Sequence, residues 1–216
     1  MSFRRIELGD GFREHSLMGM PADCVKLAVT KLFDARPDLI ISGINRGSNV
    51  ANNILYSGTV AAALEGAMLG VPSIAISLSY DHSDPVLHFE TAAEFAVRLA
   101  PSVIARGLPK GTILNVNVPN RKSEEIRGVV VSRQGEGMYI DVMEPSGGNG
   151  EIEAFKNVGE VMVYSAQGQD CDDVVVRDGF ISITPLRYDL TNHGYRDALR
   201  NWLREENIAA GLDDHA

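Results

Sequence analysis

Two short, unbroken apolar segments separated by a helical segment constrain the fold of this chain most strongly. The segments DLIISGI (38–44) and PSIAISL (72–78) are apolar almost throughout, which is typical of parallel strands covered on both faces. An alanine-rich helical pattern spans residues 58–69, and residues 21–33 carry apolar side chains at helical spacing after an initial proline. The order helix, strand, helix, strand predicts an α/β fold with a mostly parallel, doubly wound sheet.

The rest of the chain extends this pattern and then departs from it. A helix is predicted over about 87–106 and a strand over 112–119, whereas residues 3–18 predict a hairpin around Gly9-Asp10-Gly11. After residue 120 the sequence is β-rich, with a glycine-rich segment at 145–150, and predicts hairpins that project from the main body. We therefore expect one domain, 1–216, made of an α/β core (1–120, incomplete at its N-terminus), a β-hairpin extension (121–191), and a C-terminal helix and tail (192–216).

Composition limits the classes of function. The 216 residues carry a formal charge of −9, from 29 acidic against 20 basic residues, and no long Lys/Arg segment. A nucleic acid polymer is therefore not an expected partner. No segment has the roughly 20 apolar residues that a membrane span needs, and the first residues lack a secretory leader, so we expect a cytoplasmic protein without a membrane partner. Cys24 and Cys171 lie far apart and predict neither a disulfide framework nor a zinc site.

The loop after the first core strand has the residue types of an anion site. An acidic protein binds a small anion through a local device, either a bound cation or a helix N-terminus. Asn45 follows the strand at the edge of the sheet where ligands of open α/β folds bind, and its amide can ligate a hard cation or donate to a phosphate. Ser57 is a good N-cap, and Gly58 and Thr59 complete a plausible phosphate cradle, although Ser-Gly-Thr is also an ordinary helix start.

Other catalytic patterns are weaker. No Gly-x-Ser-x-Gly elbow, dinucleotide fingerprint or P-loop occurs. His193 is expected to be a loop or capping residue, and Arg133 either faces the substrate or is a solvated residue at a strand end. The segment QDCDD lacks the Gly and Glu of a calcium loop, so we expect a turn there. The adjacent pairs Asp172-Asp173 and Asp213-Asp214 are expected to be solvated.

Several motifs in one order resemble a known family. The segments GMPADCVKLAV, DLIISGINRGSN, YSGTVAAALEGAMLGVPSIAIS and DGFISITPLRYDLT, within about residues 19–195, closely resemble the SurE family of metal-dependent nucleotidases. The resemblance implies a Rossmann-like three-layer α/β sandwich with a β-hairpin extension. It also implies hydrolysis of nucleoside 5′- and 3′-monophosphates, one Mg²⁺ or Mn²⁺ per subunit, and homodimers or homotetramers.

The resemblance also implies roles for individual residues. Asn45 matches the asparagine that serves the family as a metal ligand, and Ser57, Gly58 and Thr59 match the residues that line the phosphate site. Gly43, Gly47 and Asn49 would shape the loop between them, and we assign Gly43 and Asn49 to the phosphate and substrate site as well. No catalytic residue can be identified within this chain by this comparison.

One part of the family pattern has no counterpart in this sequence. The family's other metal ligands are two aspartates in an Asn-Asp-Asp-Gly motif after the first strand, and a serine further on. A neutral Asn alone offers too few ligands and no charge for a catalytic ion. We therefore expect that Met1 is not the true start and that a longer chain supplies the first βα units. The alternative is a catalytically inactive remnant that acts as a binding or oligomerisation partner.

Overall fold

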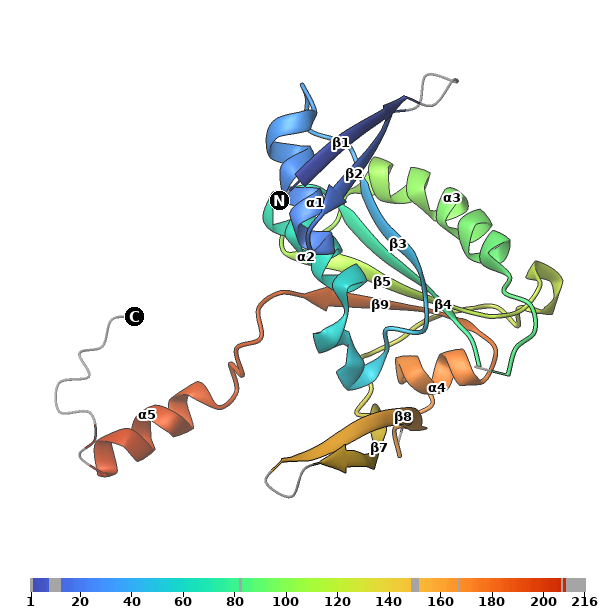
Figure 1. The fold of residues 1–216 in the computed structure, drawn as a ribbon. Helices are drawn as coiled ribbons and strands as arrows, with labels where there is room; N and C mark the ends of the chain where they lie inside the picture. The colour runs from blue at the N-terminus through green and yellow to red at the C-terminus, as the bar shows by residue number, and fades with distance from the viewer. Residues whose placement is uncertain are drawn as a thin grey trace.

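A five-stranded sheet forms the centre of the molecule (Figure 1). The computed structural model describes residues 2–7, 13–81, 83–148, 152–166, 168–206 and 208. The strand order is β3-β4-β5-β9-β6, in which β3, β4 and β5 are parallel, β9 is antiparallel to β5, and β6 is parallel to β9. The strands are β3 (Ile40–Arg46), β4 (Ser73–Ser79), β5 (Thr112–Pro119), β6 (Val129–Val131) and β9 (Ile181–Arg187). This confirms the predicted α/β class with a mostly parallel sheet.

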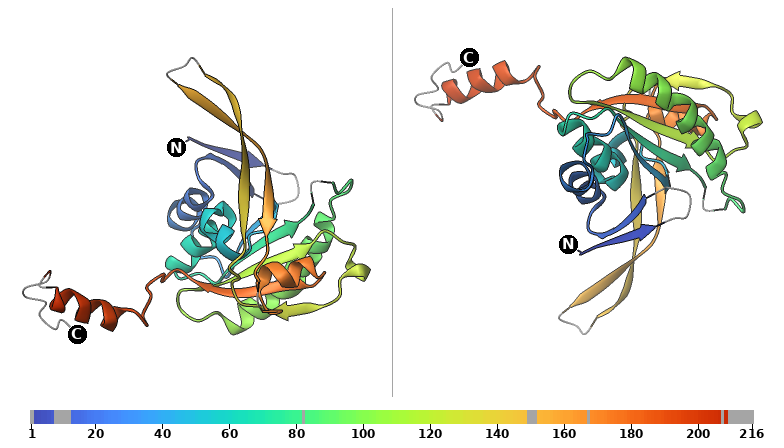
Figure 2. Two further views of the ribbon diagram at one scale, coloured as in Figure 1. Left: turned by 90° about the horizontal axis from the view of Figure 1, so that it is seen from below. Right: turned by 90° about the horizontal axis from the view of Figure 1, so that it is seen from above.

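Helices cover both faces of the sheet and make three layers (Figures 1 and 2). On one face α2 (Gly58–Met68) contacts β3 and β4, and α1 (Pro21–Leu27), which continues as a π-helical turn over Ala28–Leu32, packs against α2. On the other face lies α3 (Phe89–Arg106). The β4 side chains alternate between these two layers, with Ala75 in the core under α2 and Ile76 in the core under α3. The buried apolar residues on the two faces hold the layers together.

The N-terminal hairpin is present as predicted. Strand β1 (Ser2–Glu7) pairs antiparallel with β2 (Arg13–Met18) and forms a separate two-stranded sheet. The turn expected at Gly9-Asp10-Gly11 lies outside the described residues.

The β-rich segment after residue 120 divides differently from the prediction. Only β7 (Met138–Gly148) and β8 (Glu153–Val163) project from the body as a hairpin (Figure 2). Strands β6 and β9 instead join the main sheet, because Ile181 and Ile183 of β9 pack into the core under α3 and β9 pairs with β5. The extension is thus shorter than the predicted 121–191, and residues 149 and 150 of its glycine-rich segment lie outside the described residues.

The structure corrects the reading of QDCDDVVV. Residues expected to form a turn followed by a strand make a short helix, α4 (Asp172–Arg177). Its three valines are buried against the body, where α4 contacts β5 and β9, although valine favours strands. Asp172 and Asp173 are 0% and 1% exposed, so the prediction that this pair is solvated is wrong. The pair Asp213-Asp214 lies outside the described residues.

The C-terminal helix α5 (Arg196–Glu205) falls within the predicted 192–205. It extends away from the sheet, and none of its residues is buried (Figures 1 and 2). Residues 209–216 of the predicted tail are outside the described part of the chain. None of the helices that the structure describes is long and apolar enough to span a bilayer.

Candidate active site

A bulge in β3 determines where Asn45 points. Ser42 lies opposite Ala75 and Asn45 lies opposite Ser77, so β3 takes three residues where β4 takes two. An extra residue reverses the side-chain alternation of the strand that follows. Ile44 therefore packs into the core under α3, and Asn45 points to the α2 side, where Ser77 Oγ donates a hydrogen bond to its Oδ1 over 2.8 Å. Gly43, with φ +124°, is the residue that makes this bulge possible.

Asparagines from three segments hold the loop after β3. Asn115 Nδ2 and Asn117 Nδ2, both from β5, donate to the backbone oxygen of Asn49 over 2.8 and 3.1 Å, and Asn117 Oδ1 accepts from its backbone nitrogen. The Asn49 side chain in turn donates to Ser77 Oγ over 2.7 Å and to Asn45 Oδ1 over 3.1 Å. The structure thus brings Asn45 and Asn49 together and fixes both against β4 and β5. Asn115 and Asn117 are not among the predicted site residues, although their alternate spacing in LNVNVP places two polar side chains on one face of a buried strand.

The described residues do not fit a divalent cation by themselves. Asn45 Oδ1 already accepts two hydrogen bonds, from Ser77 Oγ and Asn49 Nδ2, and its Nδ2 donates to the oxygen of Gly47 over 2.8 Å. A carbonyl oxygen has two lone pairs, so this Oδ1 has none left for an ion. Within the part of the chain that the structure describes, no three His, Cys, Asp or Glu side chains gather as a metal site would require.

The predicted phosphate cradle begins α2. Ser57 is the N-cap, and its Oγ accepts the backbone N–H of Val60 over 3.1 Å. Gly58 lies against α1, where an added Cβ would stand 3.0 Å from Pro21 Cγ. Thr59 occupies the first turn of α2, where backbone N–H groups have no partner within the helix. The helix therefore presents the positive end of its dipole at this position.

A cleft of about 1050 Å³ joins these elements. Asn45, Asn49 and Ser57 line it, whereas Gly43, Gly58 and Thr59 are not among its lining residues. Three arginines also line the cleft, Arg46, Arg121 and Arg177, and Arg46 lies 4.5 Å above the ring of Tyr80. Five acidic residues line it as well, Asp81, Asp84, Asp141, Glu160 and Asp173, so the cleft carries both signs of charge. Arg133 and His193 are not cleft residues; they pair with Asp170 and Asp189.

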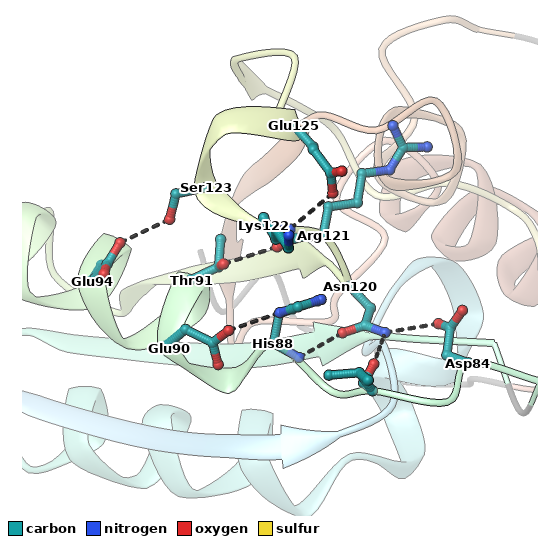
Figure 3. Close-up of polar contacts among 11 residues, drawn as sticks. Asp84, His88, Glu90, Thr91, Glu94, Asn120, Arg121, Lys122, Ser123 and Glu125 are labelled. Atoms are coloured by element: carbon teal, nitrogen blue, oxygen red, sulfur yellow. Dashed lines mark hydrogen bonds and ion pairs between the residues drawn. The ribbon is translucent and has the colours of Figure 1, made fainter.

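Asn120, at the end of β5, holds one wall of the cleft (Figure 3). Its Nδ2 donates to Asp84 Oδ2 over 2.9 Å and to the oxygen of Val86 over 2.8 Å, and its Oδ1 accepts the backbone N–H of His88. His88 Nδ1 lies 2.7 Å from Glu90 Oε1 on α3. These contacts tie the segment between β4 and α3 to β5, so this wall has a defined shape.

The base of the β7–β8 hairpin forms the opposite wall. The hydroxyls of Tyr139 and Ser48 share a hydrogen bond of 3.0 Å, and the Tyr139 backbone N–H donates to Asn53 Oδ1 over 3.1 Å. Burial raises the pKa of the Tyr139 hydroxyl, which keeps it neutral. Asn52 donates from its backbone nitrogen to the oxygen of Gly137 over 3.0 Å. The hairpin base is therefore hydrogen bonded directly to the loop that carries Asn49.

Asp172 is a buried carboxylate whose ionisation works against folding. Burial raises its pKa to about 6, although the backbone N–H groups of Gly135, Ala51 and Asp173 donate to it and act in the opposite direction. The carboxyl has an ordinary pKa of 3.8, so the folded chain holds this proton more tightly than the unfolded chain. Its contribution to stability is therefore full below pH 3.8 and is lost as the pH rises through about 6.

The raised pKa of Asp172 predicts how the stability of the protein depends on pH. Between about pH 4.5 and about pH 7.5, the free energy of unfolding of the wild type should fall by about 2 kcal/mol more than that of Asp172→Asn, which has no titrating group at this position. Urea denaturation at the two pH values measures both changes, and the difference between the proteins removes the contribution of other groups. Parallel pH curves for the two proteins would contradict the assignment.

The fold and the site together define a class of protein: an α/β sandwich with a polar cleft at the carboxyl ends of its parallel strands, beside a helix N-terminus. Comparisons with known proteins agree. The model of the family described as "Survival protein SurE" matches residues 1–141, and this chain belongs to that family.

Named relatives cover most of the chain. A protein of Chlorobium luteolum named 5'-nucleotidase SurE is 43% identical over 204 residues, which span 94% of this chain and 76% of the relative. A protein of the same name from Symbiobacterium thermophilum is 45% identical, over 87% of this chain and 72% of the relative. Among solved structures, the SurE protein of Aquifex aeolicus is 33% identical and superposes with a TM-score of 0.74, over 94% of this chain and 80% of that one.

Proposed function

We propose that this chain is a phosphomonoesterase that hydrolyses nucleoside 5′- and 3′-monophosphates to nucleoside and phosphate. One observation carries the proposal: Asn45, Asn49 and Ser57, the N-cap of α2, line a single cleft. Membership of a family whose named relatives are 5'-nucleotidases supports the choice of substrate.

The residues of the chain have separable tasks in this proposal. The first N–H groups of α2 and the helix dipole bind phosphate oxygens. The Asn45 amide, oriented by Asn49 and Ser77, faces the same phosphate. The two walls of the cleft, built around Asn120 and Tyr139, enclose the nucleoside. The volume of about 1050 Å³ is at the upper end of the range for small-molecule sites and accommodates a nucleotide.

A dependence on Mg²⁺ or Mn²⁺ is part of the proposal, as the family resemblance implies, although the described residues do not form the site of the ion by themselves. The direct test is the release of inorganic phosphate from nucleoside monophosphates, with and without Mn²⁺ and EDTA, after circular dichroism has shown that the chain is folded. We expect Mn²⁺-dependent release that EDTA abolishes. No release from a folded chain would contradict the proposal.

Ser57 allows a prediction that separates folding from phosphate binding. Ser57→Ala removes the cap of α2 and should lower the free energy of unfolding by about 1 kcal/mol. Ser57→Asp keeps an N-cap acceptor, so its stability should stay near that of the wild type, but its charge should weaken inhibition by inorganic phosphate at least about tenfold. Urea denaturation and inhibition constants measure the two effects. Wild-type inhibition of Ser57→Asp would mean that phosphate binds elsewhere.

A further inference from the structure

Residues 48–53 connect the two parts of the candidate site, which are the Asn45–Asn49 pair and the start of α2. Asn45 and Asn49 lie before the centre of this segment, and Ser57 follows it at the start of α2. At the centre, Ala51 has φ 51°, and no other described non-glycine residue has a positive φ. A residue with a Cβ is strained there and keeps this conformation only when its surroundings hold it. The contacts of Ala51 therefore determine how the two parts are placed.

Asp172, distant in sequence, makes these contacts. The Ala51 N–H donates to both carboxylate oxygens of Asp172, each over 3.1 Å, and the Ala51 oxygen accepts from Gln134 Nε2 over 3.1 Å. The N–H of Gly135 donates to Asp172 Oδ1 over 2.9 Å. Ala51 and Asp172 are both 0% exposed. One buried carboxylate thus joins the strained turn, the segment before the hairpin and the start of α4.

We propose that Asp172 is a positioning residue of the phosphate site, which holds the turn at Ala51 and so sets the placement of Asn45 and Asn49 relative to the start of α2. The proposal rests on the proposed function, because it names a residue that acts on the same site. Asp172 does not line the cleft, so it acts through the turn and not on the substrate.

The number of donors explains why a carboxylate is required. Three backbone N–H groups, those of Ala51, Gly135 and Asp173, converge on Asp172. A carboxylate offers two acceptor oxygens, whereas an asparagine of the same shape offers one oxygen and an NH₂ group that would face a donor. Asp172→Asn should therefore release at least one of these N–H groups while preserving the packing.

The neighbouring aspartate provides a matched control. Asp173 is equally buried and lies in the same turn of α4, but it accepts hydrogen bonds from Ser165, through the backbone nitrogen over 2.6 Å and the hydroxyl over 3.0 Å. Ser165 follows β8, so Asp173 holds the base of the hairpin and accepts no hydrogen bond from Ala51; unlike Asp172, it lines the cleft. The two Asp→Asn variants thus change the same chemistry at adjacent positions, but only Asp172 is hydrogen bonded to Ala51.

The experiment compares wild type, Asp172→Asn and Asp173→Asn by amide hydrogen exchange and by binding of inorganic phosphate. In Asp172→Asn, the Ala51 amide should exchange at least about tenfold faster, and phosphate should bind about five- to tenfold more weakly, with the rise in KM larger than the fall in kcat. In Asp173→Asn, exchange of the Ala51 amide should stay within about twofold of wild type, and phosphate should bind at least as tightly as in wild type, because the substitution removes a negative charge from the cleft. Ala51→Gly, added to Asp172→Asn, should restore part of the phosphate affinity, because glycine adopts this φ without strain.

The outcomes separate the inference from the proposed function. Equal phosphate affinity in the two Asp→Asn variants would overturn the role of Asp172, even if the wild type hydrolyses nucleotides. A wild type that binds phosphate but releases none from nucleotides would contradict the proposed function, while the comparison would still decide the role of Asp172. If Asp172→Asn does not fold, Gln134→Ala loosens the same turn from its other side; it should weaken phosphate binding about two- to threefold, and unchanged binding would overturn the inference.

Discussion

Asn45→Ala is expected to lower phosphate release from nucleoside monophosphates by at least about 100-fold, the usual effect of removing one preorganised polar group from an active site. The side chain lines the cleft, and two hydrogen bonds from Ser77 and Asn49 fix its orientation. Initial rates of the wild type and the variant over a Mn²⁺ titration measure this loss.

Two controls keep this result interpretable. Asn45→Ala also leaves Ser77 Oγ and Asn49 Nδ2 without their shared acceptor, so the free energy of unfolding should fall by about 1–3 kcal/mol. Urea denaturation shows whether the variant remains folded under assay conditions. Asn201→Ala, at an exposed position on α5, should leave the rate unchanged. An Mn²⁺ titration of Asn45→Ala that matches the wild type would contradict the role given to Asn45.

Gly43→Ala should be the most destabilising of the proposed substitutions. A Cβ at this position would lie 2.1 Å from the backbone oxygen of Ile76, and the φ of +124° is one that residues with a side chain rarely adopt. Strand β4 cannot move away, because it lies between β3 and β5 and Ile76 is 0% exposed. We expect a loss of at least about 4 kcal/mol in the free energy of unfolding, a large part of the total for a domain of this size.

Gly47 offers a matched control for Gly43. It also has a positive φ, +105°, but a Cβ there would have no neighbour within 4 Å. Gly47→Ala therefore introduces backbone strain without a collision and should cost about 1–2 kcal/mol. Urea denaturation monitored by circular dichroism compares the two variants. Equal losses would mean that the contact with Ile76 is relieved by a shift of the backbone, and that the bulge in β3 is more adaptable than the structure indicates.

The family resemblance and the local sequence patterns predict different features of the protein. The order of motifs led to the correct family and to the α/β class, and apolar patterns placed the elements of the core close to their observed bounds. The N-cap at Ser57 was also predicted, because capping depends on residues three positions apart. The roles of Asn45, Asn49 and the Ser57–Thr59 segment in binding remain predictions that the experiments above test.

The errors have a common physical origin. The segment DVVV lies in the region predicted to be β-rich, yet burial against β5 and β9 makes it part of α4. Asp172 is expected to be solvated, because short polar turns usually lie at the surface. In the structure it accepts a hydrogen bond from the backbone N–H of Ala51, 121 residues away in the sequence. Residue propensity and spacing reflect interactions between residues close together in the sequence, whereas the contacts of α4 and Asp172 join residues far apart in the sequence.

Periodicity and capping, which act within a few residues, are sufficient to predict the helices and strands of residues 21–119, their order and the start of α2. The direction in which Asn45 faces depends instead on packing between segments. A regular strand would direct it toward α3, and the bulge at Gly43, fitted against β4, turns it toward Ser77 and Asn49. The structure alone also placed Asp172 under Ala51 and the hairpin base against the loop. These are long-range contacts, which form only when segments far apart in the chain pack together.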